Sequence, residues 1–351
     1  MLRTRGFVNA AVLAAGLMTT SLVGGLQQET PPPQEGQAPE GALPNGPVER
    51  PRVVGEARTP EEWEAWQLVE RSTRLAEKAG LAESFLQNYP DSGLTANAHY
   101  IIAQNYYQTG DIENFVLHAE EAIAEIPDAP ELLAQLSFFY AENGQAAQAI
   151  DRATRSLEVI ERVEKPASVP ANQWVDQVYQ LKAEANYALG RAHLSRMSRT
   201  ENRAEDPNLK IAIEHLQNTL RYDPRHDYAC FRLGFAERNS NNAAGALMAY
   251  GKAVVIGGVA AQPAQGQLED VLSIVKVSMP DSEWAEKSIH EIIDQALGEL
   301  DKSMVANQQE RAQLIQELQQ REIRQQMPQG ESSGDLPKFP DPSTGGPTEE
   351  M

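Results

Sequence analysis

The segment from Ala96 to Leu157 reads ANAHYIIAQNYYQTGDIENFVLHAEEAIAEIPDAPELLAQLSFFYAENGQAAQAIDRATRSL and repeats one pattern at a fixed offset. Antiparallel helices approach to about 8–10 Å only where the contacting side chains are short. Small residues recur 34 positions apart in this segment, at Ala103 and Ser137 and again at Ala122 and Ser156. The spacing therefore predicts two consecutive helical hairpins whose crossings lie at these positions.

Turn signals recur with the same offset. Gly110 and Gly144 each follow an amphipathic run, where one helix must stop and the chain must reverse. Pro127 closes the first unit, because proline cannot continue a helix interior. A helix-turn-helix unit that recurs every 34 residues resembles the tetratricopeptide repeat (TPR). The resemblance implies an all-α fold, an α-solenoid of TPR-like helix-turn-helix hairpins with C-terminal capping helices.

One departure from the family pattern lies in the first unit. Phe115 takes a position that the family keeps small, and Ala119, one helical turn later, takes a position that the family keeps large. We expect that the two volumes have been exchanged within one crossing.

Four units are expected along the chain. A loop from Glu164 to Pro170 separates the second from the third, which carries a polar insertion, Met197 to Asn208, between its helices. In the fourth unit, asparagine in the turn Asn239 to Asn242 can adopt the left-handed conformation that glycine supplies earlier. The small crossing residues of these two units are Gly190, Ala212, Thr219, Gly234, Ala246 and Ala253. The expected units span residues 96–129, 130–163, 172–226 and 227–260.

The N-terminal residues have the layout of an export signal. Arg3 and Arg5 precede an apolar run from Phe7 to Met18, and Val23-Gly24-Gly25 offers a cleavage site, so residues 1–25 predict a secretory signal peptide. An uncleaved membrane anchor is the alternative, since no charge occurs from Gly6 to Gln28. Both readings predict an exported chain, periplasmic, in the cell envelope or secreted. Residues 26–58 are proline-rich and predict a disordered linker.

Residues 59–95 are expected to form leading helices, or a partial repeat. The motif Thr59-Pro60-Glu61-Glu62 predicts a helix start with a capping box. Phe85, the run Tyr89-Pro90-Asp91-Ser92, and Ala98 with Tyr100 resemble the leading repeat of bacterial envelope TPR proteins that act in outer-membrane assembly and cell division. This resemblance implies an envelope location.

Residues 265–326 are expected to cap the solenoid, with a long helix from about Ser282 to Gln326 that follows a start signal at Ser278 to Asp281. Dimerisation through this helix is the alternative, although Asn307 and Arg311 interrupt the apolar seam that a coiled coil needs. The seam residues are Leu297, Leu300, Met304, Leu314 and Leu318. Residues 327–351 have no apolar period and predict a disordered tail.

The composition and the motifs give no sign of catalysis. The net charge of −20 argues against nucleic-acid binding, and the single cysteine, Cys230, cannot form an intramolecular disulfide. His290 and Glu291 begin like a zinc-protease helix, but Asp294 stands where the second histidine is needed. We therefore expect no enzyme activity, no catalytic residue, no cofactor and no metal.

The TPR resemblance implies a partner-binding groove lined by the first helix of each hairpin. Some members of the family use a lysine and asparagine clamp for terminal carboxylates, and these groove positions do not reproduce it. Several of the rings could instead be hairpin core, Tyr107 and Phe231 above all. The expected groove residues are Tyr100, Gln104, Tyr107, Phe138, Tyr187, Arg191, Tyr228, Phe231, Phe235 and Arg238.

Aromatic and arginine side chains often supply much of the energy at protein interfaces. The sequence thus predicts a non-enzymatic envelope scaffold that binds a protein or peptide partner. The alternative is a membrane-tethered structural protein that oligomerises through its long C-terminal helix. The oligomeric state itself stays open.

Overall fold

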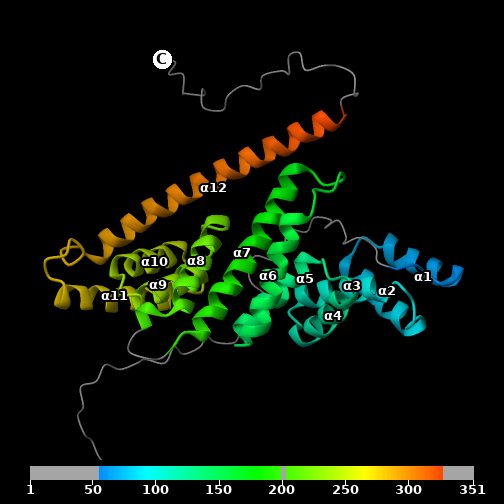
Figure 1. Cartoon of the computed structure of the whole chain (residues 1–351), viewed down its shortest axis with the longest axis horizontal. Helices are drawn as coiled ribbons and strands as arrows, with labels where there is room; N and C mark the ends of the chain where they lie inside the picture. Colours follow the sequence, from blue (N-terminus) through cyan, green and yellow to red (C-terminus); the bar gives the residue numbers. More distant parts are fainter. Residues whose placement is uncertain (1–54, 199–202, 327–351) are drawn as a thin grey trace, which may run out of the picture. The chain divides into compact units, whose positions relative to one another are not determined.

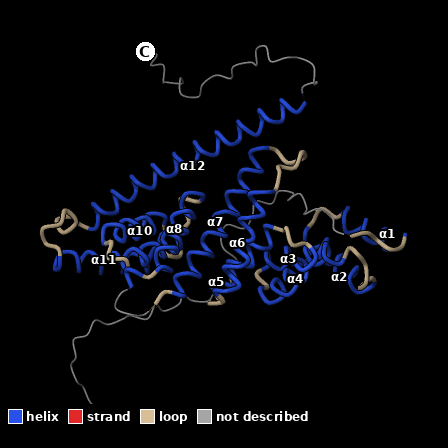
Figure 2. Tube along the Cα trace, viewed as in Figure 1, coloured by secondary structure: helices blue, strands red, loops and turns tan. Residues whose placement is uncertain are grey.

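The structure, a computed structural model, describes residues 55–198 and 203–326 (Figure 1). Every regular element within these residues is helical, and no strand occurs among them (Figure 2). The predicted signal peptide or anchor, most of the predicted linker, and the predicted tail lie outside the described residues. None of the described helices is long and apolar enough to cross a membrane.

Helices pack in successive antiparallel pairs, each helix against its neighbour in the chain. The first helices of the four pairs are α3 (Thr95–Thr109), α5 (Pro130–Glu142), α7 (Ala171–Arg196) and α9 (Asp227–Asn239). Their second helices are α4 (Ile112–Glu125), α6 (Ala146–Arg162), α8 (Pro207–Tyr222) and α10 (Ala243–Ile256). Before them come α1 (Pro60–Arg71) and α2 (Leu75–Asn88), and after them α11 (Ala261–Ser278) and α12 (Ile289–Gln326). The chain is an all-α solenoid of TPR-like hairpins.

The crossings lie at the small residues that the 34-residue spacing identifies. Ala103 and Ser137 are fully buried, and a methyl group added at Gly190 or Gly234 would collide with a side chain of the facing helix. Phe115 and Ala119 are both fully buried in the first hairpin, as expected if their volumes are exchanged.

The turns between paired helices share one backbone conformation. Gly110 has φ 75° and Gly144 has φ 73°, and Asn241 takes the equivalent place in the fourth hairpin with φ 63°. Asparagine is one of the few residues besides glycine that accept this left-handed region at low cost. In the third hairpin the connection is longer, since α7 ends at Arg196 and α8 begins at Pro207.

The first described helix begins at the predicted cap, and the Thr59 side chain accepts a hydrogen bond from the Glu62 backbone N–H at 3.2 Å. The Glu62 carboxylate does not complete the expected capping box with Thr59. It accepts instead from the Arg58 backbone N–H at 2.7 Å and from the Ser92 hydroxyl at 3.1 Å. Glu62 therefore joins the start of α1 to the turn that precedes α3.

The long C-terminal helix starts later than the sequence suggests. The expected start near Ser282 is wrong, because α12 begins at Ile289. A capping box at Ser288 accounts for the difference: its hydroxyl and backbone N–H donate to the Glu291 carboxylate, and its hydroxyl oxygen accepts from the Glu291 N–H. The residues from Met279 to Ser288 form turns that join α11 to α12.

α12 lies against the repeats of its own chain, where it contacts α10, α8 and α7 (Figure 1). Ala296 meets α10 at Gly251, where an added methyl group would lie 2.9 Å from the Ala296 Cβ. Farther along, the Asn307 amide donates to the carbonyl oxygens of Arg221 and Tyr222 at 2.6 and 3.1 Å. These carbonyls end α8 and have no partner inside that helix. The polar seam position at Asn307 thus serves an intramolecular contact.

Candidate binding surface

The first helices of the hairpins form a continuous row, which we call the first-helix row (α3, α5, α7 and α9). α5 packs on α7, α7 contacts α9, and α9 contacts α11. The amides of Gln104 and Gln135 exchange hydrogen bonds of 3.1 and 3.5 Å, which join α3 to α5. The ten expected groove residues all lie on this row.

Three of the expected groove residues are buried, namely Tyr100, Tyr107 and Tyr187, with 6%, 8% and 1% of their surface exposed. Their rings belong to the core more than to an open surface. The remaining seven keep part of their surface exposed: Gln104, Phe138, Arg191, Tyr228, Phe231, Phe235 and Arg238. The accessible part of the predicted site is therefore concentrated on α9, with single contributions from α3, α5 and α7.

Tyr187 holds α5, α7 and α9 together. Its hydroxyl donates to a Glu142 carboxylate oxygen at 2.8 Å, and its ring stacks on His226 with the centroids 4.7 Å apart. The Phe138 ring also packs against Tyr187, with the centroids 5.6 Å apart. Burial and the nearby Glu142 charge raise the Tyr187 pKa well above its usual value, so this hydroxyl stays protonated and keeps donating.

The two arginines of the expected groove already have polar partners. Arg191 Nε lies 3.7 Å from a Glu142 carboxylate oxygen, and Arg238 donates to the Gln267 amide oxygen of α11 at 2.7 Å. Phe231 and Phe235 on α9 remain half-buried, packed against the core on one side. This end of the row offers aromatic surface beside arginines that are held in place.

Two acidic residues of the row were missed by the sequence prediction. Glu131 in the first turn of α5 and Glu184 in the middle of α7 are half-buried, and each lies six residues before the small crossing residue of its hairpin. Counting back from Ser137 and Gly190 would have found them. Burial raises the pKa of each carboxyl to about 7, and the charge of Glu131 contributes to the shift at Glu184.

The hydroxyl of Tyr100, on α3, is a third polar group near Glu131. Among the described residues, no donor or acceptor lies within hydrogen-bonding distance of this buried hydroxyl. The Glu131 charge contributes to raising the Tyr100 pKa, which puts the hydroxyl within electrostatic reach of that carboxyl. Buried hydroxyls in native proteins nearly always have a partner, so this one calls for an explanation.

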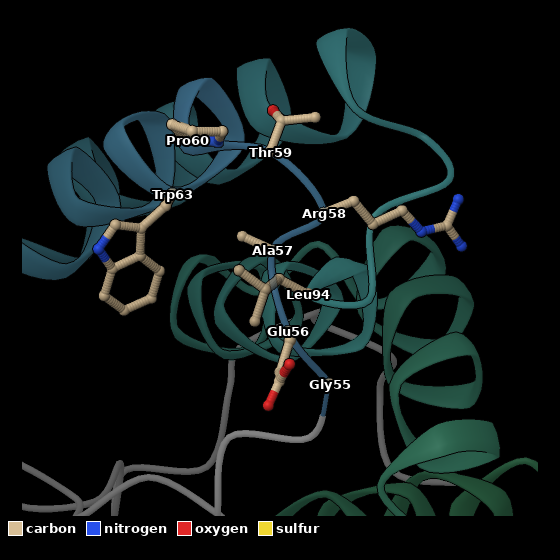
Figure 3. A pocket seen from close by; sticks show the side chains of 8 residues that line it. All are labelled: Gly55, Glu56, Ala57, Arg58, Thr59, Pro60, Trp63 and Leu94. Atoms are coloured by element: carbon tan, nitrogen blue, oxygen red, sulfur yellow. The ribbon is translucent and has the colours of Figure 1, made fainter.

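A hollow of about 420 Å³ lies between the segment 55–60 and the residues Trp63 and Leu94 (Figure 3). The side chains of Glu56, Arg58 and Trp63 point away from one another in this view. Small-molecule sites need a few polar groups that converge on the ligand. This hollow does not provide them.

A second hollow, of about 350 Å³, is lined by His99 of α3 and by Glu121 and Glu125 of α4. The Nδ1 atoms of His99 and His118 lie 2.8 Å apart beside it, so one imidazole donates to the other. Within residues 55–198 and 203–326, His, Cys, Asp and Glu side chains form no group of three or more that could hold a metal ion.

No protein-family model matches the chain, and no curated protein matches it either. Solved structures that are similar to the chain at a low level include the following two. One is PilW, described as a widely conserved type IV pilus biogenesis factor, with a TM-score of 0.36 and 14% identity over 64% of this chain and 97% of PilW. The other is the MamA protein, with a TM-score of 0.35 and 16% identity over 62% of this chain and 94% of MamA. At these values neither match bears on function, and the fold assignment rests on the repeats of the chain itself.

Proposed function

We propose that this chain is a non-enzymatic protein-binding scaffold of the TPR type, which acts in the bacterial cell envelope and holds a partner segment along its first-helix row. The family assignment is supported by the 34-residue spacing of crossings and turns in the first two hairpins, and by the same spacing from Ala212 to Ala246 and from Thr219 to Ala253 in the last two. The layout of residues 1–25 supports export, and the resemblance of residues 85–100 to envelope TPR proteins supports the location.

One observation carries the binding role. Four aromatic side chains of the expected groove stay partly exposed, Phe138 on α5 and Tyr228, Phe231 and Phe235 on α9. Half-buried rings beside arginines resemble the energetic centres of protein interfaces, because a rigid ring loses little entropy when a partner covers it. An ordinary solvated helix face would carry charged residues at these positions.

The test compares three forms of the full-length chain. The first is the wild type, and the second is the double variant Phe235→Ala with Arg238→Glu. The third is a matched control on the second helices, Leu117→Ala with Lys210→Glu, which likewise truncates one apolar side chain and reverses one positive charge, at exposed positions of α4 and α8. Each form is used to capture proteins from an envelope extract, and the recovered partner is then titrated in purified form.

We expect the control to bind the purified partner as the wild type does, and the α9 variant to bind at least tenfold more weakly. Helicity must be equal in all three forms. Equal binding by all three forms would mean that the first-helix row is not the binding surface.

The alternative, a tethered oligomer built through the long helix, has less support. Leu300 and Asn307 of its predicted seam are buried against the chain's own repeats, and Arg311 forms an ion pair with Asp176 of α7. The seam positions that are buried in this way cannot also pair with a second copy, whereas Leu297 is 45% exposed. Sedimentation of the full chain over a range of concentrations tests this, since a dimer that is lost on deletion of residues 299–326 would favour the alternative.

A further inference from the structure

We propose that the surface between α3, α5 and α7, centred on Glu131, Glu184 and the Tyr100 hydroxyl, receives one basic side chain, lysine or arginine, of the bound partner. We call these three residues the acidic subsite. This inference rests on the proposed function, because it assigns the chemistry of one place along the same row.

The first argument is charge. Glu131 and Glu184 come from two packed helices, and their carboxyls are close enough to repel each other. Neither carboxyl has an ion-pair partner among the described residues, and Arg191, seven residues after Glu184 on α7, is paired with Glu142 instead. On α7, Lys182 is likewise occupied, 2.6 Å from Glu161 of α6. A cation from outside would neutralise the pair without competing with a resident one.

The second argument is the Tyr100 hydroxyl. It is more than nine-tenths buried, it has no partner in the described part of the chain, and it is within electrostatic reach of Glu131. A phenolic oxygen can accept a hydrogen bond from an ammonium or guanidinium group. One cationic group of the partner would therefore both neutralise the two carboxylates and donate a hydrogen bond to the Tyr100 hydroxyl oxygen.

The surroundings are polar in the way that a charged side chain needs. The amide of Gln180 donates to Glu184 at 3.3 Å and orients its carboxylate, and Gln104 and Gln135 hold α3 against α5. Tyr107 is a second titratable group of α3 near the pair, because the charge of Glu184 contributes to raising its pKa. Two carboxylates and a phenol are too few for a dedicated metal site, whereas they suffice for a basic side chain whose backbone is held elsewhere along the row.

The experiment uses the full-length chain and an array of short capped peptides that are random except for a central lysine, arginine, norleucine or glutamate. The test variant is Glu131→Gln with Glu184→Gln. The matched control is Glu113→Gln with Glu158→Gln, which also removes two negative charges, from exposed positions on α4 and α6. Peptides with a free N-terminal amine but no basic residue distinguish a chain terminus from a side chain.

We expect the wild type and the control to prefer central lysine or arginine over norleucine, and the test variant to lose roughly ten- to a hundredfold of that preference. Equal preference in the test variant and the control overturns the subsite and leaves the binding role intact. Absence of any captured peptide on the wild type overturns the binding role itself. Capture that depends on the free terminus also overturns the assignment to a side chain.

Two further measurements guard against misfolding of the test variant. Tyr100→Phe keeps the buried ring and removes only the hydroxyl, so we expect native helicity with a several-fold weaker binding of basic peptides. Calorimetry in buffers of different ionisation enthalpy should show proton release on binding near pH 7, because the bound cation lowers the raised carboxyl pKa values. Binding without proton release, or unchanged binding by Tyr100→Phe, contradicts the proposal.

Discussion

The first two hairpins and the last two differ in the side chains that fill the crossing of their two helices. In the first two, α3 and α5 carry Ala103 and Ser137 at the crossing, and one position of the facing helices is alanine, Ala119 and Ala153. In the last two hairpins, the crossing residue of the first helix is glycine, Gly190 or Gly234. The facing helix carries a large residue, Leu216 or Tyr250, at the position equivalent to Ala119 and Ala153. A methyl group added at Gly190 would lie 2.7 Å from Leu216, and one added at Gly234 would lie 2.6 Å from Tyr250.

The difference shows that the fold accepts more than one division of side-chain volume between the two helices of a crossing. Protein interiors are close-packed, so a volume removed from one helix must be supplied by the other. In the first hairpin, Phe115 supplies this volume one helical turn before Ala119. Four variants test this comparison and the contrasting surfaces of the two halves, from the largest expected effect to the smallest.

Removal of the bulky residue from the first crossing should cost the most. Phe115→Ala opens a cavity in a fully buried place beside Tyr107, and we expect the free energy of unfolding to fall by about 3–5 kcal/mol. Urea unfolding followed by circular dichroism measures the loss. Leu117→Ala, on the same helix but 56% exposed, is the control and should stay within about 0.5 kcal/mol. Equal losses for both variants would show that Phe115 does not fill the crossing.

Gly234→Ala should break the opposite arrangement. Alanine favours a helix over glycine by about 1 kcal/mol, but here the new methyl group would meet the fully buried Tyr250 ring. We expect a net destabilisation of about 1–2 kcal/mol, since overpacking outweighs the propensity gain. Gly266→Ala on α11, with open space around it, should instead stabilise by up to about 1 kcal/mol. A gain at both positions would mean that the glycine is not required by close approach.

The acidic surface of the first half should give stability a pH dependence. The pKa of Glu131 is raised from 4.5 to about 7, so its contribution favours the folded state at pH below about 4.5 and is lost as the pH rises to about 7. Glu131→Gln should therefore stabilise the chain by about 1–2 kcal/mol at pH 8 and by much less at pH 5, allowing for partial exposure of the carboxyl. Thermal unfolding at both pH values measures it. The exposed Glu113→Gln should show no such difference, and a similar curve for both variants would contradict the assignment.

The pair of His99 and His118 should have the smallest effect on stability, and its pH dependence should be opposite to that of Glu131. Burial, together with the charge of His118, lowers the pKa of His99, and burial lowers that of His118 against the raising influence of Glu83 and Glu121. Stability from this pair is present above pH 6.5 and is lost as the pH falls. His118→Gln should remove that acid-side loss, by about 0.5–1 kcal/mol at pH 5. An unchanged slope between pH 7 and pH 5 in thermal unfolding would contradict this.

The chemistry also changes from one helix to the next along the first-helix row. At the position six residues before the crossing, the row carries Asn97, Glu131 and Glu184 and then Tyr228. At the position one residue after the crossing it carries Gln104, Phe138, Arg191 and Phe235. The same backbone thus offers acids near α5 and rings near α9. A partner segment with a basic side chain at one end and apolar side chains at the other would match both.

Local patterns in the sequence were sufficient for the hairpins. The 34-residue offset located the crossings, and glycine and asparagine predicted the left-handed turns at Gly110, Gly144 and Asn241, because both features depend on residues close together in the chain. The proposed groove was located only coarsely. Its ten residues do share one row, but whether a ring such as Tyr187 is core or surface depends on which neighbouring helix covers it.

Amino-acid order alone determined the repeat, the helix pairs and the turn chemistry, since each follows from periodicity and from backbone preferences within a few residues. Only the tertiary structure decided where α12 lies, because Asn307 meets the end of α8 some 86 residues away and no periodic signal records that contact. The raised carboxyl pKa values of Glu131 and Glu184 also required the folded chain. Desolvation and charge proximity depend on distances between helices, and these distances exist only after the repeats have packed.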